Sequence, residues 1–172
     1  HLLRISLILI SSGLFMTSCS NLRNLETAKS SPATTTTLNL SSSGLAVVPE
    51  DIAAMTNLQK LVLFRNKIET IPDFIGNLTK LETLSVQSNK LKSLPPEIGQ
   101  LSRLTKLDLR FNQLKLLPDE SCNLAELVEL DVRNNLIDSL PFCIGDLSKL
   151  EYLYLADNNL LHLPESIKNL KN

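Results

Sequence analysis

The chain has 172 residues with a formal net charge of −1 at pH 7, and 43% of its residues are hydrophobic although only 4% are aromatic. This near balance of charge gives no electrostatic case for nucleic-acid binding, which requires a clustered basic surface. The three cysteines have no CxxC spacing and the chain has only two histidines, so we expect no zinc site of the usual kind. The hydrophobic residues are mostly leucine, which predicts an aliphatic core.

The first 18 residues have the pattern of a signal peptide. A single positive charge at Arg4 precedes an apolar run over residues 5–16, and small residues follow. That run is too short to cross a bilayer as a helix. We therefore expect residues 1–18 to direct export and to be removed.

The segment MTSC at residues 16–19 resembles a bacterial lipobox, with Met16 in the place where leucine is usual. The resemblance implies that the chain is cut before Cys19 and acylated there, and acyl chains at Cys19 would anchor it stably to a membrane. Ser20 follows, which in the lipoproteins that this segment resembles favours the outer membrane. Ordinary cleavage near residues 18–20, with a soluble secreted product, is the alternative.

Residues 19–34 are polar, rich in serine and threonine, and contain one proline. Such a composition is typical of flexible linkers. The sequence therefore predicts a tether between a membrane anchor and the rest of the chain.

The rest of the chain consists of six repeats of 23 residues without insertions. The repeats cover residues 35–57, 58–80, 81–103, 104–126, 127–149 and 150–172. Prolines recur at this interval, at Pro49, Pro72, Pro95, Pro118, Pro141 and Pro164. A fixed period in this range indicates a solenoid, because one unit cannot bury its own leucines whereas neighbouring units can bury them together.

Written once, the unit is LxxLxLxxNxLxxLPxxIGxLxx, which resembles the 23-residue class of the leucine-rich repeat (LRR) family. Members of that class occur in bacterial surface proteins and in intracellular Ras-linked scaffolds. The fold predicted for residues 35–172 is an α/β solenoid, curved and of six repeats, with a parallel sheet on its concave side. In each strand, side chains such as Leu84 and Val86 point inward. The proline, as the first residue of a helix, and the acids after it predict short helical turns on the convex side.

Asparagines at the turn after each strand predict a structural ladder. A buried amide carries donors and acceptors, so each asparagine can bond backbone groups of its own coil and of the next coil. The members are Asn66, Asn89, Asn112, Asn135 and Asn158.

Departures from the repeat are expected to have structural consequences. Ser121 and Cys122 replace the isoleucine and the glycine of the fourth repeat, which predicts a local packing fault. Thr35 and Ser43 give the first repeat the character of a degenerate cap. The last repeat would present an apolar edge through which copies of the chain could self-associate. That edge includes Leu155, Leu160 and Ile167.

Cys122 and Cys143 lie in adjacent repeats at nearly matching places. In an exported chain they could form a disulfide. The alternative is a pair of free thiols, and only geometry decides between the two.

The sequence predicts neither an enzyme nor a cofactor. His162 has no recognisable nucleophile or orienting partner, and neither a P-loop nor a glycine-rich phosphate cradle is present. Asp108 and Asp131 would form an acid pair, but the sequence builds no pocket walls around them and nothing that would raise the pKa of one acid, as a glycosidase requires.

Outward-facing strand positions define a candidate ligand-binding face on the concave sheet. Apolar side chains lie near one end and tyrosines near the other, with Asp and Arg between them, and such aromatic residues with arginines resemble the anchors of protein interfaces. The candidates are Val62, Phe64, Arg65, Lys106, Asp108, Arg110, Phe111, Glu129, Asp131, Arg133, Tyr152 and Tyr154.

The favoured hypothesis is a non-enzymatic binding module at the bacterial cell envelope that holds a protein or a glycan. Adhesion or host interaction is what the resemblance to bacterial surface proteins implies. One alternative is an intracellular scaffold of the Ras-linked type, which predicts no export and reduced cysteines. The other is the LRR part of a longer effector enzyme.

Overall fold

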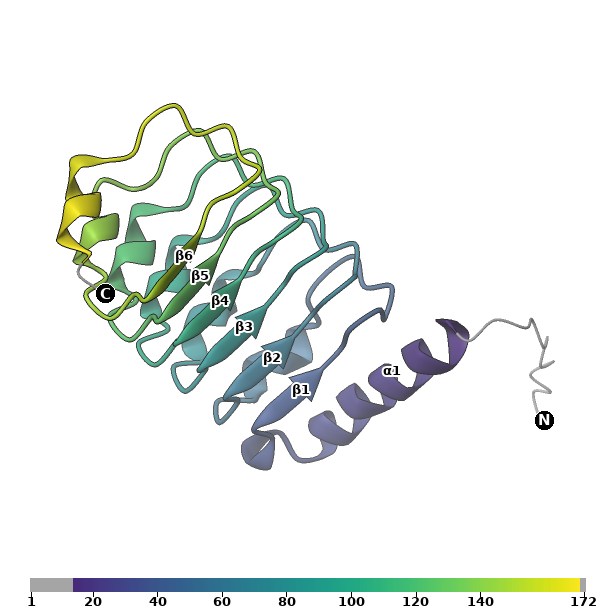
Figure 1. The fold of residues 1–172 in the computed structure, drawn as a ribbon. Helices are drawn as coiled ribbons and strands as arrows, with labels where there is room; N and C mark the ends of the chain where they lie inside the picture. Colours follow the sequence, from purple (N-terminus) through teal and green to yellow (C-terminus); the bar gives the residue numbers. More distant parts are fainter. Residues whose placement is uncertain (1–13, 171–172) are drawn as a thin grey trace, which may run out of the picture.

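A computed structural model describes residues 14–170 of the chain, and the side chains of residues 21–170. Most of the predicted signal peptide and the side chain of Cys19 lie outside this description. A helix, α1 (Leu14–Ser30), is followed by six stacked coils that form a curved solenoid (Figure 1). This arrangement confirms the predicted LRR solenoid.

Each coil contributes one short strand to a single parallel sheet. The strands are β1 (Thr37–Asn39), β2 (Lys60–Val62), β3 (Thr83–Ser85), β4 (Lys106–Asp108), β5 (Glu129–Asp131) and β6 (Tyr152–Tyr154). They lie in sequence order, and each residue pairs with the residue one repeat later, as Leu84 does with Leu107. The constant repeat length therefore sets the register of the whole sheet.

Short 3-10 helices form the convex side. They are η2 (Glu50–Ala54), η3 (Asp73–Asn77), η4 (Pro96–Gln100), η5 (Asp119–Asn123), η6 (Ile144–Asp146) and η7 (Glu165–Asn169), and η1 (Pro32–Thr34) links α1 to the first coil. The prediction that the repeated proline is the first helical residue is wrong. Pro72, for example, has an extended backbone (φ −75°, ψ 156°) and directly precedes η3. It is the last residue of the extended segment that connects the strand to the helix.

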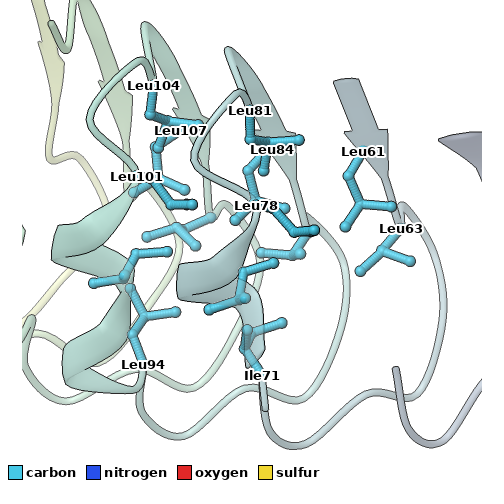
Figure 2. Packing of buried hydrophobic residues seen from close by; sticks show 14 of the residues in the cluster. Leu61, Leu63, Ile71, Leu78, Leu81, Leu84, Leu94, Leu101, Leu104 and Leu107 are labelled. Carbon is cyan, nitrogen blue, oxygen red and sulfur yellow. The ribbon is translucent and has the colours of Figure 1, made fainter. Parts of the chain in front are cut away.

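The core is a column of aliphatic side chains between the sheet and the convex turns. Strand residues Leu84 and Leu107 point toward Leu78 and Leu101 of the turns (Figure 2), and all four are almost completely buried. Burying a leucine contributes about 1.5–3 kcal/mol. Each coil obtains this contribution only from its neighbours, which makes the fold a nearest-neighbour stack.

The asparagine ladder connects every coil to the one before it. The Nδ2 group of Asn89 donates to the carbonyls of Leu63 and Val86, both at 2.9 Å, and its Oδ1 accepts from the amide of Ile68 at 3.0 Å. The same pattern recurs at Asn66, Asn112, Asn135 and Asn158. The amide thus bonds its own coil and the preceding coil, so the predicted bond to the next coil is wrong.

Helix α1 covers the first edge of the sheet, beside β1 (Figure 1). Leu25 and Ala28 lie one helical turn apart and are buried against the first coil. Asn21 donates to the carbonyl of Ser41, and Lys29 lies 3.5 Å from the carboxylate of Asp51. The predicted flexible tether is therefore wrong for this segment. Its apolar residues, sparse in the sequence, share one helix face and shield an otherwise unpaired strand edge.

The residue at the glycine place of the repeat sets the spacing of the convex helices. A Cβ atom on Gly99 would lie 2.3 Å from the carbonyl oxygen of Glu120, so glycine allows η4 and η5 to pack closely. Ala53 and Cys122 occupy the same place in other coils, and there the helices lie farther apart. The first gap leaves a groove of about 680 Å³ lined in part by Val47, Pro72 and Phe74.

A disulfide between Cys122 and Cys143 spans the second gap, with the two Cα atoms 5.9 Å apart. The sequence allowed either a disulfide or a pair of free thiols, and the structure shows the disulfide. The predicted packing fault is present beside it, because Ser121 is 3% exposed and its Oγ has no hydrogen-bond partner among the described residues. A buried hydroxyl without a partner destabilises a fold.

Replacing Ser121 with isoleucine, the residue of the repeat, is expected to raise the free energy of unfolding by about 1–2 kcal/mol. The change removes an unpaired hydroxyl and adds apolar contacts in the core. Urea unfolding of both chains measures the difference. Ile98→Ser, the inverse change in the preceding coil, is the matched control and should be strongly destabilising. Lower stability of Ser121→Ile would show that the coil has closed around the smaller side chain.

Candidate ligand-binding face

The candidate face is formed by the outward residues of the six strands and of the turn after each strand. Its most exposed aromatic residues are Phe111, Tyr152 and Tyr154, with 52%, 50% and 36% of their surfaces accessible. The rings of Tyr152 and Tyr154 are nearly parallel, with centroids 6.3 Å apart. The guanidinium of Arg133 lies 4.7 Å from the centre of the Tyr154 ring, a cation–π contact that fixes that ring. We call Arg133, Tyr152 and Tyr154 the tyrosine cluster.

Two aspartates and two arginines form an ion-pair network in the middle of the face. Arg110 binds Asp108 through Nε and Nη2 at 3.0 and 2.9 Å. Arg133 binds Asp131 in the same way, at 3.0 and 2.6 Å. The Nε of Arg110 also lies 3.3 Å from Asp131, which joins the two pairs across β4 and β5.

The prediction that Asp108 and Asp131 contact a ligand directly is wrong. Their side chains are only 6% and 3% exposed, because each arginine folds back over the aspartate two residues before it on the same face of the strand. Both oxygens of each carboxylate accept hydrogen bonds from an arginine that covers it. Their role is to position Arg110 and Arg133.

Hydrogen bonds within the network stabilise the charged form of both arginines. The bond to Asp108 raises the pKa of Arg110, and the bond to Asp131 raises the pKa of Arg133. Both side chains are about one-third exposed. The network therefore presents two oriented, permanently charged guanidinium groups whose charge is balanced from beneath.

The remaining charges of the face differ between its two ends. Lys106 pairs with Glu129 across β4 and β5 at 2.7 Å. Within residues 21–170, Lys60 and Arg65 at the β2 end form no ion pair. Arg65 lies 5.7 Å from the centre of the Phe64 ring, and Phe64 and Val62 are half-buried beside it. The β2 end therefore has two uncompensated positive charges over an apolar base.

Six residues whose backbone lies in the left-handed region form a row along the border of the face. The sequence predictions did not include this row. The residues are Ser42, Arg65, Ser88, Phe111, Asn134 and Asp157, all with φ between 53° and 57°. Such φ values are uncommon for residues other than glycine and especially for bulky ones such as Phe111. Asn, Asp and Ser at four of the six places are the turn signal that could have indicated it. The turn directs the Phe111 side chain into solvent.

The described residues show no arrangement typical of a metal centre or of a membrane span. Residues 21–170, whose side chains the structure describes, contain no group of three or more His, Cys, Asp or Glu placed to hold a metal ion. Within residues 14–170, no helix has both the length and the apolar content that crossing a bilayer requires. His162 is exposed in the last coil.

Comparison with known proteins supports the repeat assignment. The model of the leucine rich repeat family matches residues 33–91, 79–137 and 102–160. A comparison with curated proteins found no match. The chain is similar to the LRR ectodomain of the plant membrane receptor kinase GASSHO1/SCHENGEN3 from Arabidopsis thaliana, solved in complex with CASPARIAN STRIP INTEGRITY FACTOR 2. The TM-score is 0.69 with 33% identity, over 77% of this chain and 17% of the ectodomain.

The chain thus spans less than a fifth of that ectodomain's length. It is also 25% identical to an LRR protein of Leptospira interrogans, with a TM-score of 0.39, over 87% of this chain and 62% of that protein. The family matches together cover residues 33–160, well over half of the 172 residues. The chain belongs to the leucine-rich repeat family, whose domains are generally protein-binding modules.

Proposed function

We propose that the protein is a non-enzymatic module at the bacterial cell envelope that binds a protein ligand on its concave face. The observation that carries this proposal is the tyrosine cluster, in which Arg133 holds the exposed ring of Tyr154 and the ring of Tyr152 stacks beside it. Tyrosine and arginine supply most of the binding energy at many protein interfaces. Rigid rings add contact area at a small cost in conformational entropy.

The plant LRR ectodomain that resembles this chain was solved with a bound partner, CASPARIAN STRIP INTEGRITY FACTOR 2. That comparison supports a polypeptide ligand for the repeat architecture. The ion-pair network adds to this support, because the arginines cover Asp108 and Asp131 and present oriented guanidinium groups for contact with a ligand.

Export and lipid attachment at Cys19 are the second part of the proposal. The signal-peptide pattern supports them, and so does the disulfide between Cys122 and Cys143, because disulfides persist mainly in oxidising compartments. The disulfide disfavours the intracellular scaffold. Intact-mass measurement of the native protein should find a chain that begins at Cys19 and carries added acyl mass. An uncut chain without lipid would contradict this part of the proposal.

Replacing Tyr154 or Arg133 with alanine is expected to weaken binding of a concave-face ligand about tenfold or more. Tyr154→Ala should change the melting temperature little, whereas Arg133→Ala should lower it, because the buried carboxylate of Asp131 loses its bidentate partner. The probe is a peptide selected from a random twelve-residue display library on the full native chain. Fluorescence polarisation gives the affinities. Phe142→Ala, on the convex side and 77% exposed, is the matched control. Equal affinity for all four chains would exclude the tyrosine cluster as the ligand site.

A further inference from the structure

The charge of the concave face differs between its β2 end and its β6 end, and this difference indicates which kind of ligand the face would bind. We infer that the ligand, on the binding function proposed above, includes an extended segment with acidic side chains over β2 and an apolar side chain over β6. The two ends are matched to Lys60 and Arg65 at one side and to the tyrosine cluster at the other.

The acidic end follows from which charges remain available to a ligand. In the middle of the face, Arg110 and Arg133 are balanced by the aspartates beneath them, and Lys106 is balanced by Glu129. Lys60 and Arg65 are exposed and have no carboxylate partner among the described residues. Glu82, which directly precedes β3, forms no ion pair with either cation in the part of the chain that the structure describes. Unpaired cations attract a carboxylate without first having to release an internal partner.

The apolar end follows from the tyrosine cluster and from the sign of the charge beside it. Half of the surface of Tyr152 is accessible, and the parallel Tyr154 ring extends the apolar platform. Asp157, in the turn after β6, is exposed and forms no ion pair within residues 21–170. An acidic side chain placed here would face this carboxylate, whereas an apolar one would cover the rings. The face therefore accepts the segment only with its acidic side chains over β2 and its apolar side chain over β6.

The spacing of the strands sets the length of the segment. Four strand intervals separate β2 from β6, and parallel strands lie about 4.8 Å apart, which gives about 19 Å. An extended chain advances about 3.4 Å per residue, so the acidic and apolar positions should be about five or six residues apart. Next to β2, the short side chain of Ser85 on β3 leaves room for an extended backbone.

The test is selection from the same random peptide library on two full-length chains, the native one and the Lys60→Glu, Arg65→Glu variant. Native selection should enrich peptides with one or two acidic residues five or six positions from an aromatic or branched apolar residue. The variant should bind these peptides at least tenfold more weakly and should select basic residues at the same position. Both cations are exposed, so thermal unfolding should be unchanged.

The outcomes separate this inference from the proposed function. Enriched peptides that need Tyr154 but have no acidic preference, or whose selection the variant does not change, would overturn the inference and leave the binding function intact. Enrichment of no peptide, or only of peptides insensitive to Tyr154→Ala, would overturn both. Affinity of the acidic peptides should also fall with added salt, because exposed ion pairs are screened.

Discussion

Replacing Asn112 with alanine is expected to lower the free energy of unfolding by about 2–4 kcal/mol. The change leaves the buried amide of Leu91 without its acceptor. It also removes one of two side-chain donors from the carbonyls of Val86 and Leu109, which keep Asn89 and Asn135 respectively. An unsatisfied buried amide costs about 1–3 kcal/mol and each lost hydrogen bond about 0.5–1.5 kcal/mol, and Leu91 has no sheet or helix partner to replace the Asn112 side chain. Equilibrium urea unfolding followed by circular dichroism measures the loss.

The matched control is Asn123→Ala. Asn123 is exposed at the end of η5, and its side chain makes no hydrogen bond that the structure shows, so we expect a change within about 0.5 kcal/mol. The interior ladder position also predicts a regional effect. Hydrogen exchange should accelerate first in the coils that contain Val86 and Leu109. A loss at Asn112 no larger than at Asn123 would mean that water satisfies the freed groups.

Removing the disulfide by Cys122→Ser with Cys143→Ser is expected to cost about 3 kcal/mol, the value for a closed loop of this length. The cysteines are 21 residues apart, and the bond crosses the gap between η5 and η6. Few other contacts join those two helices, since Cys122 occupies the glycine place that lets η3, η4 and η5 pack closely. The disulfide therefore takes the place of direct packing between η5 and η6.

A reducing agent provides the control for the disulfide prediction. It should lower the urea midpoint of the native chain to about that of the double variant and should leave the variant unaffected. A native chain insensitive to complete reduction, verified by thiol titration, would show that the two coils are held by their core alone. Because coil 6 lies outside the disulfide-bonded pair of coils, its loss of structure should precede that of coils 4 and 5 in either case.

The fold was predictable because every coil repeats the same physical requirement. Leu84 and its equivalents recur one repeat apart and have to be buried together, and that spacing fixes both the strand register and the number of coils. The direction of the asparagine bonds was not predictable in the same way. A backbone turn can in principle direct the Asn89 side chain toward the preceding coil or toward the next coil. Only the coordinates show that it bonds Ile68 of the preceding coil.

The candidate face was predictable in position but not in accessibility. Alternation along a strand places Asp131 and Tyr154 on the same face of the sheet, as the structure shows. Alternation does not show that Arg133 folds over Asp131 while leaving Tyr154 accessible. Helix α1 was missed for a related reason: its buried side consists of very few apolar residues, and its polar remainder has the composition of a linker.

Helix α1 also limits how far the proposed anchor lets the protein reach. About a dozen residues separate Cys19 from the end of α1, or about 18 Å of helix, and the helix is packed against the first coil rather than hanging free. A lipid at Cys19 would thus hold the solenoid close to the bilayer with little freedom to swing. A solenoid held in this way can reach ligands in the same membrane or on a closely apposed surface. It is poorly suited to binding ligands far from the membrane.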